Sequence, residues 1–177
     1  DRSLTVSTIP LDHRIDCCGY LFREKPTLPH IRRDMIDCYD IPLSQINNIK
    51  NGADWVTSDG ETISNSLLTT PSVPPRAYAY CSDTRYMLSL AEQIKGVDVL
   101  YHEATYDSSC EARARLYYHS TAAQAAQVAR DAAVGKLVLG HFSARYDNES
   151  CLLQEAQAIF PNSLLAGEGL VVNVQKP

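Results

Sequence analysis

Short apolar runs that are rich in β-branched and aromatic residues recur along the chain, and they predict strands. Segments with alanine and leucine at helical spacing lie between several of these runs and predict helices. The expected strands are 4–9, 15–22, 77–81, 97–101, 136–139, 163–165 and 170–174. The expected helices are 86–94, 122–134 and 151–160. Because strands and helices alternate, the pattern favours a domain of the α/β sandwich type.

Prolines, glycines and capping residues mark the expected element boundaries. Pro10 is predicted to end the first strand, because proline cannot donate a hydrogen bond to a sheet. Gly19 is predicted to be a bulge or a point of close backbone approach in the second strand. Thr121 and Gln124 fit a capping box at the start of helix 122–134, and Gly135 fits its end.

Residues 23–52 interrupt this alternation with three prolines. Two short helical pieces are predicted there, at 30–38 and 43–50. We therefore expect a single domain over residues 1–177, with an arm that leaves the domain at about 24–52.

Length, charge and cysteine usage narrow the class of protein. A chain of 177 residues can form one domain with a sizeable core. No apolar run approaches the roughly 20 residues of a membrane span, and no signal-peptide pattern is present. The net charge of −5 argues against binding nucleic acid over the whole surface. Six cysteines without a C-x-x-C pair predict neither a zinc finger nor a disulfide framework, so a reducing, cytoplasmic compartment fits best.

One local cluster of positive charge stands out against this acidic balance. Arg23, Lys25, Arg32 and Arg33 lie within eleven residues, and Glu24 is the one acid among them. Taken on its own, the cluster is explained better by a solvated face than by a phosphate-binding role.

Polar side chains follow four of the predicted strands directly. These are His13, Asp83, the pair His102 and Glu103, and His141. Ligands of open α/β sheets bind at the carboxyl ends of the strands. Imidazole and carboxylate are ligands that zinc accepts, and an aspartate can bridge two metal ions in a site for displacement at phosphorus. Each residue taken singly also fits a turn or a cap.

Several of these residues belong to stretches that resemble the ribonuclease Z family, the tRNA 3′-endonucleases of the metallo-β-lactamase superfamily. The stretches are Leu11-Asp12-His13 with Cys18-Gly19-Tyr20, Ser82-Asp83-Thr84, His102-Glu103-Ala104-Thr105, His119-Ser120-Thr121 and Gly140-His141-Phe142-Ser143-Ala144-Arg145-Tyr146. They stand in the family's order and span nearly the whole chain. The resemblance implies an α/β fold, the carboxy-terminal half of an αββα sandwich of the metallo-β-lactamase type with an inserted arm.

The resemblance also implies a role for each matching residue. His13 would bind one zinc ion, Asp83 would bridge two, and His141 would bind the second. Glu103 would orient the imidazole of His119, and His119 would act as the general acid for the leaving 3′-oxygen.

Substrate contacts follow from the same resemblance. Ser143 and Arg145 would hold a substrate phosphate, since a guanidinium can bind two of its oxygens. An ion pair of Arg145 with Asp147 or Glu149 is the structural alternative. Arg32 and Arg33 lie where the family's arm begins, which favours contact with tRNA phosphates.

Two departures from the family pattern stand out. The family's His-x-His-x-Asp-His signature, which supplies the other zinc ligands, occurs nowhere in the chain. The resemblance therefore implies a carboxy-terminal fragment that is inactive in isolation. In the arm, Pro42-Leu43-Ser44-Gln45 stands where the family often has a Gly-Pro pair.

The resemblance implies a zinc-dependent endoribonuclease that removes the 3′ trailer from precursor tRNA. It would bind two zinc ions per active site and act as a cytoplasmic homodimer. Two alternatives remain open at this point. One is another hydrolase of the same superfamily that acts on a small ester or phosphodiester, and the other is a non-catalytic binding module.

Overall fold

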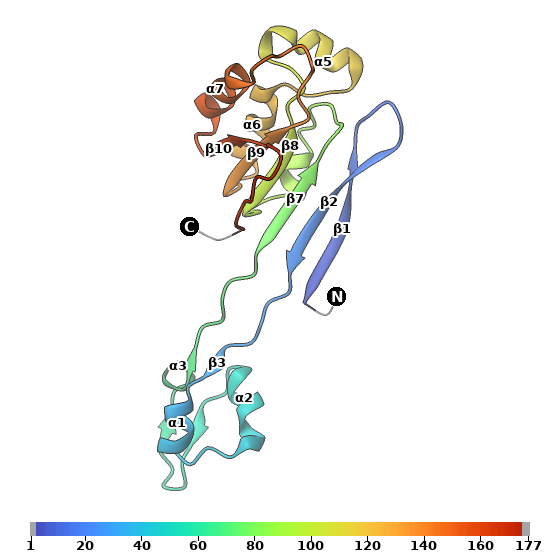
Figure 1. Cartoon of the computed structure of the whole chain (residues 1–177). Helices are drawn as coiled ribbons and strands as arrows, with labels where there is room; N and C mark the ends of the chain where they lie inside the picture. Colours follow the sequence, from blue (N-terminus) through green and yellow to red (C-terminus); the bar gives the residue numbers. More distant parts are fainter. Residues whose placement is uncertain (1–2, 175–177) are drawn as a thin grey trace. The chain divides into compact units, whose positions relative to one another are not determined.

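The computed structural model describes residues 3–174 and divides into two compact units (Figure 1). One unit is built from the segment that ends at Glu24 and the segment that begins at Arg76. The other is Lys25–Pro75, which contains the segment predicted as an arm. None of the helices in the described part of the chain is both long enough and apolar enough to cross a membrane.

The first unit is organised around a mixed sheet. Across the sheet, the strands are β1 (Leu4–Leu11), β2 (Cys17–Glu24), β7 (Ala77–Cys81), β8 (Val99–Glu103), β9 (Lys136–Gly140) and β10 (Ser163–Leu165). The pairs β1–β2 and β2–β7 are antiparallel, whereas β7, β8, β9 and β10 run parallel. Three neighbouring parallel strands, β7 to β9, therefore end at the same edge.

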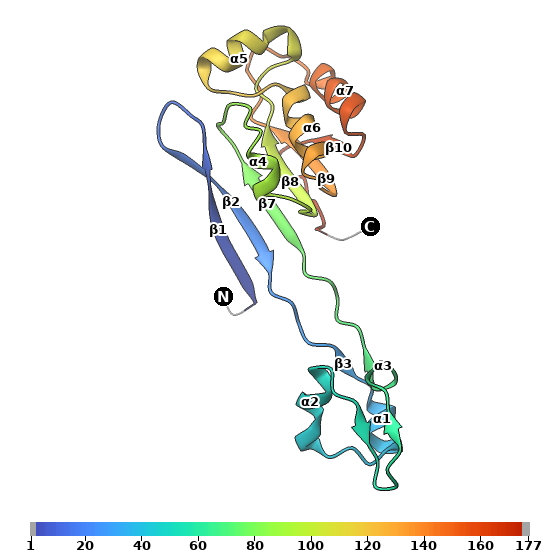
Figure 2. The same cartoon turned by 180° about the vertical axis from the view of Figure 1, so that it is seen from behind.

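Helices cover one face of this sheet (Figure 2). They are α4 (Leu90–Gln93), α6 (Ala122–Asp131) and α7 (Ser150–Ile159), while the short η2 (Ser108–Cys110) and α5 (Glu111–Tyr117) follow β8. Ala77, Ala79 and Cys81 of β7 are buried in the same core as the alanines of α6. These small side chains allow the helix to approach the sheet closely.

Aromatic side chains occupy the opposite face. The rings of Phe22 and Tyr78 stack with centroids 5.8 Å apart, and those of Tyr80 and Tyr101 with centroids 4.7 Å apart. The segment 166–174 lies against part of this face. Residues 170–174 were predicted as a strand, and that prediction is wrong, because the segment pairs with no strand in the described part of the chain.

Two predicted boundaries near the site differ from the structure. The strand predicted at 97–101 is β8, which runs to Glu103, so His102 and Glu103 lie within the strand and not after it. The helix predicted at 122–134 ends at Asp131, because Ala133, with φ of 51°, turns the chain before Gly135 is reached.

Further predicted boundaries also differ from the structure. Pro10 does not end β1 but pairs with Cys18, which the edge position of β1 allows, since a missing N–H there interrupts no second ladder. The second strand begins at Cys17 instead of residue 15, because the residues around Ile15 form the loop that carries His13. The helix predicted at 86–94 is only Leu90–Gln93, because the preceding residues form the loop after β7.

The second unit has a small core of its own, made by Ile41, Ile49, Ile63 and Leu68. Both predicted helical pieces are confirmed, although the first is shorter than expected. The helical elements are α1 (Arg33–Cys38), η1 (Leu43–Gln45), α2 (Ile46–Lys50) and α3 (Asn65–Leu68). Two small strand pairs join β3 (His30–Ile31) to β6 (Thr69–Thr70), and β4 (Trp55–Val56) to β5 (Thr62–Ile63).

Gly19 is confirmed as a point of close backbone approach. A Cβ at this position would overlap the carbonyl oxygen of Tyr80 on the neighbouring strand. We expect Gly19→Ala to destabilise the protein by about 1–3 kcal/mol, because the backbone of β7 must shift to accommodate the methyl group. Thermal unfolding measures the effect. Gly167→Ala is the matched control, since a Cβ at Gly167 meets nothing within 4 Å. Equal melting temperatures for the two variants would contradict the prediction.

Candidate metal and catalytic site

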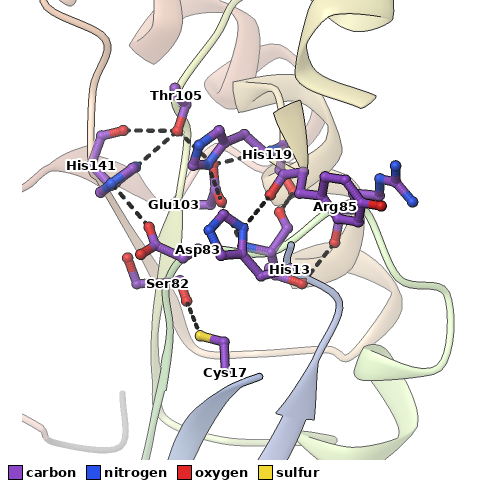
Figure 3. Close-up of polar contacts among 12 residues, drawn as sticks. His13, Cys17, Ser82, Asp83, Arg85, Glu103, Thr105, His119 and His141 are labelled. Atoms are coloured by element: carbon purple, nitrogen blue, oxygen red, sulfur yellow. Dashed lines mark hydrogen bonds and ion pairs between the residues drawn. The ribbon is translucent and has the colours of Figure 1, made fainter. Parts of the chain in front are cut away.

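The candidate site lies where three parallel strands of the first unit end (Figure 3). Asp83 follows β7, Glu103 is the last residue of β8, and His141 follows β9. Their convergence agrees with the general position of ligand sites in α/β sheets.

Asp83 and His141 form the open part of the cluster. Asp83 Oδ1 lies 2.9 Å from His141 Nε2, and both side chains are 41% exposed. This distance is typical of an ion pair. Asp83 Oδ1 is itself buried by protein atoms, yet it accepts no hydrogen bond from any residue within 3–174. Both residues have left-handed backbone conformations, with φ of 60° at Asp83 and 57° at His141. Such conformations in residues other than glycine are costly and concentrate at functional sites.

Glu103 forms the buried part of the cluster. Its side chain is completely buried and accepts four hydrogen bonds. The donors are the backbone N–H of Thr84 (2.6 Å), the backbone N–H of Ser120 (3.0 Å), the hydroxyl of Thr105 (2.6 Å) and Nδ1 of His119 (3.0 Å). Burial alone would raise the pKa of Glu103, but the bonds from His119, Thr105 and Ser120 outweigh burial and lower it. Glu103 is therefore a buried anion.

His119 connects this anion to the open part of the cluster. The hydrogen bond to Glu103 raises the pKa of His119, although partial burial opposes the effect. The His119 ring stacks on that of His141, with centroids 5.2 Å apart. Helix α6 begins just after it with the predicted capping box of Thr121 and Gln124, which is confirmed and fixes the chain at this point.

His13 lies beside the cluster in the loop between β1 and β2. Its Nδ1 is 3.0 Å from the carbonyl oxygen of Tyr118, and its ring centroid is 5.3 Å from that of His119. Because a carbonyl only accepts hydrogen bonds, the proton of this bond belongs to His13 Nδ1 and the lone pair to Nε2. Nε2 of His13 is therefore not used by this hydrogen bond and can bind a metal ion.

His102, the other member of the polar pair that ends β8, does not belong to the open cluster. It is fully buried, and its Nδ1 donates to the carbonyl oxygen of Glu103 at 2.8 Å. Burial lowers the pKa of His102, so the imidazole is neutral in the core.

The donor atoms suit a metal ion. Asp83, Glu103, His119 and His141 each place a potential ligand atom within 4.8 Å of the others. The oxygens of Glu103 are already engaged by four hydrogen bonds, whereas Asp83 Oδ1 accepts none within the described range 3–174. A carboxylate oxygen beside an imidazole nitrogen is a ligand arrangement that zinc accepts. Asp83 and His141 are therefore the better donors.

The predicted substrate-binding residues lie in different places. Ser143 is in the loop after His141, and its N–H donates to the carbonyl oxygen of Thr105 at 3.2 Å. Arg145 donates to Sγ of Cys110 at 3.0 Å, and its guanidinium lies 5.3 Å from the ring centroid of Tyr106. No ion pair of Arg145 with Asp147 or Glu149 is present among the residues that the structure describes.

Arg32 and Arg33 belong to the second unit. Arg32 forms an ion pair with Asp34 at 2.6 Å, and Arg33 is an exposed residue at the start of α1.

Two contact residues had no predicted role. Thr105 hydrogen-bonds both Glu103 and His141, and Arg85 lies over the ring of Tyr118 with its guanidinium carbon 3.5 Å from the centroid. Thr105 is the last residue of His102-Glu103-Ala104-Thr105, one of the stretches that resemble the ribonuclease Z family, so the sequence did indicate that it lies near the site. No feature of the sequence pointed to the stacking of Arg85.

Curated relatives match nearly the whole chain. A protein named ribonuclease Z from Bacteroides fragilis (strain YCH46) is 58% identical over 174 residues, which are 98% of this chain and 57% of the relative. The ribonuclease Z of Phocaeicola vulgatus is 58% identical over 175 residues, again 57% of its own length. The chain thus spans somewhat more than half the length of these relatives. No protein-family model matches the sequence.

Solved structures show the fold. Human tRNase Z, short form, aligns with a TM-score of 0.58 and 19% identity over 99% of this chain and 45% of that one. The metallo-β-lactamase fold protein YhfI from Bacillus subtilis aligns with a TM-score of 0.59 and 17% identity over 94% of this chain and 48% of that one. The predicted resemblance to ribonuclease Z and the predicted metallo-β-lactamase fold are both confirmed.

Proposed function

Because this chain resembles ribonuclease Z over 98% of its length, we propose that the intact protein is a metal-dependent endoribonuclease that removes the 3′ trailer from precursor tRNA. One observation carries the proposal. A buried carboxylate, Glu103, holds the imidazole of His119 at 3.0 Å beside the pair Asp83 and His141. A general acid–base pair next to metal-binding side chains provides the groups that catalyse hydrolysis of a phosphodiester.

The metal site in this proposal binds two zinc ions. His13 would hold one of them, His141 would hold the other, and Asp83 would contribute its carboxylate to both. The free oxygen of Asp83 and its 2.9 Å approach to His141 Nε2 support this assignment. Bound cations of this kind activate water for attack on phosphorus and stabilise the charge on the phosphate oxygens.

His119 is the general acid of the proposed reaction. Its raised pKa favours the protonated imidazole, with Nδ1–H directed at Glu103 and a second proton on Nε2. As the bond between phosphorus and the 3′-oxygen breaks, the Nε2 proton passes to that oxygen. The products are a tRNA with a 3′-hydroxyl and a trailer with a 5′-phosphate. Glu103 stabilises the imidazolium and fixes its orientation.

Ser143 and Arg145 contact substrate phosphate in this proposal. Arg145 is exposed and contacts a thiol and an aromatic ring, so no carboxylate in the described range competes for its guanidinium. Arg32 and Arg33 of the second unit contact tRNA phosphates further from the cleaved bond. The protein acts in the cytoplasm as a homodimer, and six free cysteines are consistent with a reducing compartment.

Removal of the second unit tests the proposed substrate. Glu24 and Arg76 flank this unit, and the N–H of Glu24 donates to the carbonyl oxygen of Arg76 at 2.9 Å. An Asn-Gly turn between these neighbours should therefore close the sheet after residues 25–75 are deleted. We expect the full-length protein without residues 25–75 to lose affinity for precursor tRNA but to keep activity on a small phosphodiester. Failure of the intact protein to cleave precursor tRNA would refute the proposed function.

A second variant tests whether the positive charges of the second unit, and not only its presence, contribute to tRNA binding. Changing both Arg32 and Arg33 to serine should weaken tRNA binding. In a plot of the logarithm of the binding constant against the logarithm of the salt concentration, the slope should fall in magnitude by about one for each phosphate contact that is lost. The matched control changes Lys95 and Arg130, two exposed basic residues of the first unit, to serine. Equal effects of the two double variants would contradict a specific role for the arm and indicate nonspecific electrostatic attraction.

A further inference from the structure

Thr105 lies between the buried and the open parts of the site. Its Oγ1 is 2.6 Å from Glu103 Oε2, 2.9 Å from His141 Nδ1 and 3.0 Å from the carbonyl oxygen of His141 (Figure 3). The residue is 5% exposed, so water does not replace these partners. One hydroxyl therefore connects Glu103 to His141.

The number of protons available decides the direction of each bond. A threonine hydroxyl has one proton to donate and lone pairs that accept. Glu103 is an anion and only accepts, so the shortest contact of Thr105, at 2.6 Å, takes the hydroxyl proton. Thr105 Oγ1 is then an acceptor toward His141, and the proton of that bond belongs to His141 Nδ1. The lone pair of a neutral His141 is consequently on Nε2.

This tautomer determines what faces Asp83. His141 Nε2 is 2.9 Å from Asp83 Oδ1, so a lone pair of the imidazole faces a carboxylate oxygen that accepts no hydrogen bond in the described part of the chain. Two acceptors at this separation repel each other unless a proton or a metal cation lies between them. The same hydroxyl that satisfies Glu103 thus directs the metal-binding nitrogen of His141 toward its partner ligand.

We propose that Thr105 is a positioning residue that holds His141 in the Nδ1–H tautomer and couples it to Glu103. Glu103 then orients two imidazoles, His119 by a direct bond and His141 through Thr105. The proposal rests on the metal site proposed above and assigns a role to a residue outside that ligand set. Replacing such an outer partner of a metal-binding histidine typically costs about 10–100-fold in metal affinity.

The first test measures the tautomer in the wild-type protein. Full-length protein labelled with ¹⁵N at histidine is freed of metal, and the two ring nitrogens of His141 are identified from their chemical shifts and their couplings to the ring protons. Loss of one set of signals in His141→Asn assigns them. We expect a protonated Nδ1 and an unprotonated Nε2. A proton on Nε2 with a bare Nδ1 would overturn the proposal, and this outcome does not depend on whether any Thr105 variant folds.

The second test compares Thr105→Val, which keeps the shape but removes the hydroxyl, with Thr105→Ser, which keeps the hydroxyl. We expect Thr105→Val to weaken binding of Zn²⁺ alone by about 10–100-fold and to shift His141 away from the Nδ1–H tautomer. Thr105→Ser should restore both to within a few-fold of the wild type. Equal zinc affinities for the valine variant and the wild type would overturn the proposal.

A control separates positioning from general destabilisation. Ser163 also has a buried hydroxyl, which donates to the carbonyl oxygen of Phe160, but it lies on β10 beside Leu137, away from the end of β9 that carries the site. Ser163→Ala should leave the zinc affinity and the His141 signals unchanged, and an equal loss of zinc affinity in this variant would overturn the proposal.

The proposed function and this inference can fail separately. None of these measurements uses RNA, so a protein that does not cleave precursor tRNA could still show the expected tautomer. Conversely, an active ribonuclease whose His141 signals and zinc affinity do not respond to Thr105→Val would refute the role of Thr105 alone.

Discussion

Asp83→Asn in the full-length protein should abolish binding of the metal pair and, with it, hydrolysis of precursor tRNA. Asp83 Oδ1 is the oxygen that faces His141 Nε2 and accepts no hydrogen bond within the described part of the chain. In the proposed site, removing the negative charge would leave two neighbouring cations without a shared anion, and their mutual repulsion would be uncompensated. Metal content of the purified variant, measured by mass spectrometry of the metals, gives the result directly.

Asparagine removes the charge of Asp83 without disturbing the backbone at this position. Asp83 has φ of 60°, a conformation that asparagine adopts more readily than alanine. Loss of metal in Asp83→Asn therefore reports the charge and not a collapsed loop. Asp147→Asn, an exposed residue of the loop after His141, is the matched control and should keep its metal. Two metal ions retained per chain in Asp83→Asn would remove this residue from the proposed ligands.

His119→Ala should lower turnover by about 10²–10⁴-fold while leaving tRNA affinity nearly unchanged, because a general acid acts in the transition state. Glu103→Gln should show a smaller loss of the same kind, because Glu103 acts through His119 and does not itself transfer the proton. Because the two residues form one unit, the double variant should lose much less than the product of the single losses. Single-turnover cleavage of a precursor tRNA measures all three.

His30→Ala is a suitable control, because His30 is an exposed histidine of the second unit. It should leave the rate of the chemical step unaltered. If the losses for His119→Ala and Glu103→Gln multiply, or if affinity falls and turnover does not, the pair has a structural role only.

Sequence patterns predicted the parts of the fold that depend on apolar periodicity. The runs that became β7, β8 and β9 are buried strands, and polar residues directly after such strands converge at one edge of the sheet. For this reason Asp83, Glu103 and His141 could be expected to meet. The capping box of Thr121 and Gln124 was equally predictable, because it is a local interaction of four residues.

Features that depend on tertiary neighbours could not be predicted. The left-handed backbone of Asp83 and His141 has no local signal, since the surrounding structure imposes it. Residues 170–174 look like a strand from composition, but a strand also needs a partner, and the described part of the chain supplies none. Pro10 is tolerated within β1 because of its place at the sheet edge, which the sequence does not state.

The backbone at Asp83 and His141 also implies a trade-off between stability and activity. Each left-handed residue that is not glycine costs roughly 1–2 kcal/mol. Glycine would relax both loops, yet it would remove the carboxylate and the imidazole that the proposed chemistry requires. Selection for thermal stability alone should therefore enrich glycine or asparagine at these two positions, and selection for activity should remove them. A library screened separately for each property would expose these residues as places where the two demands conflict.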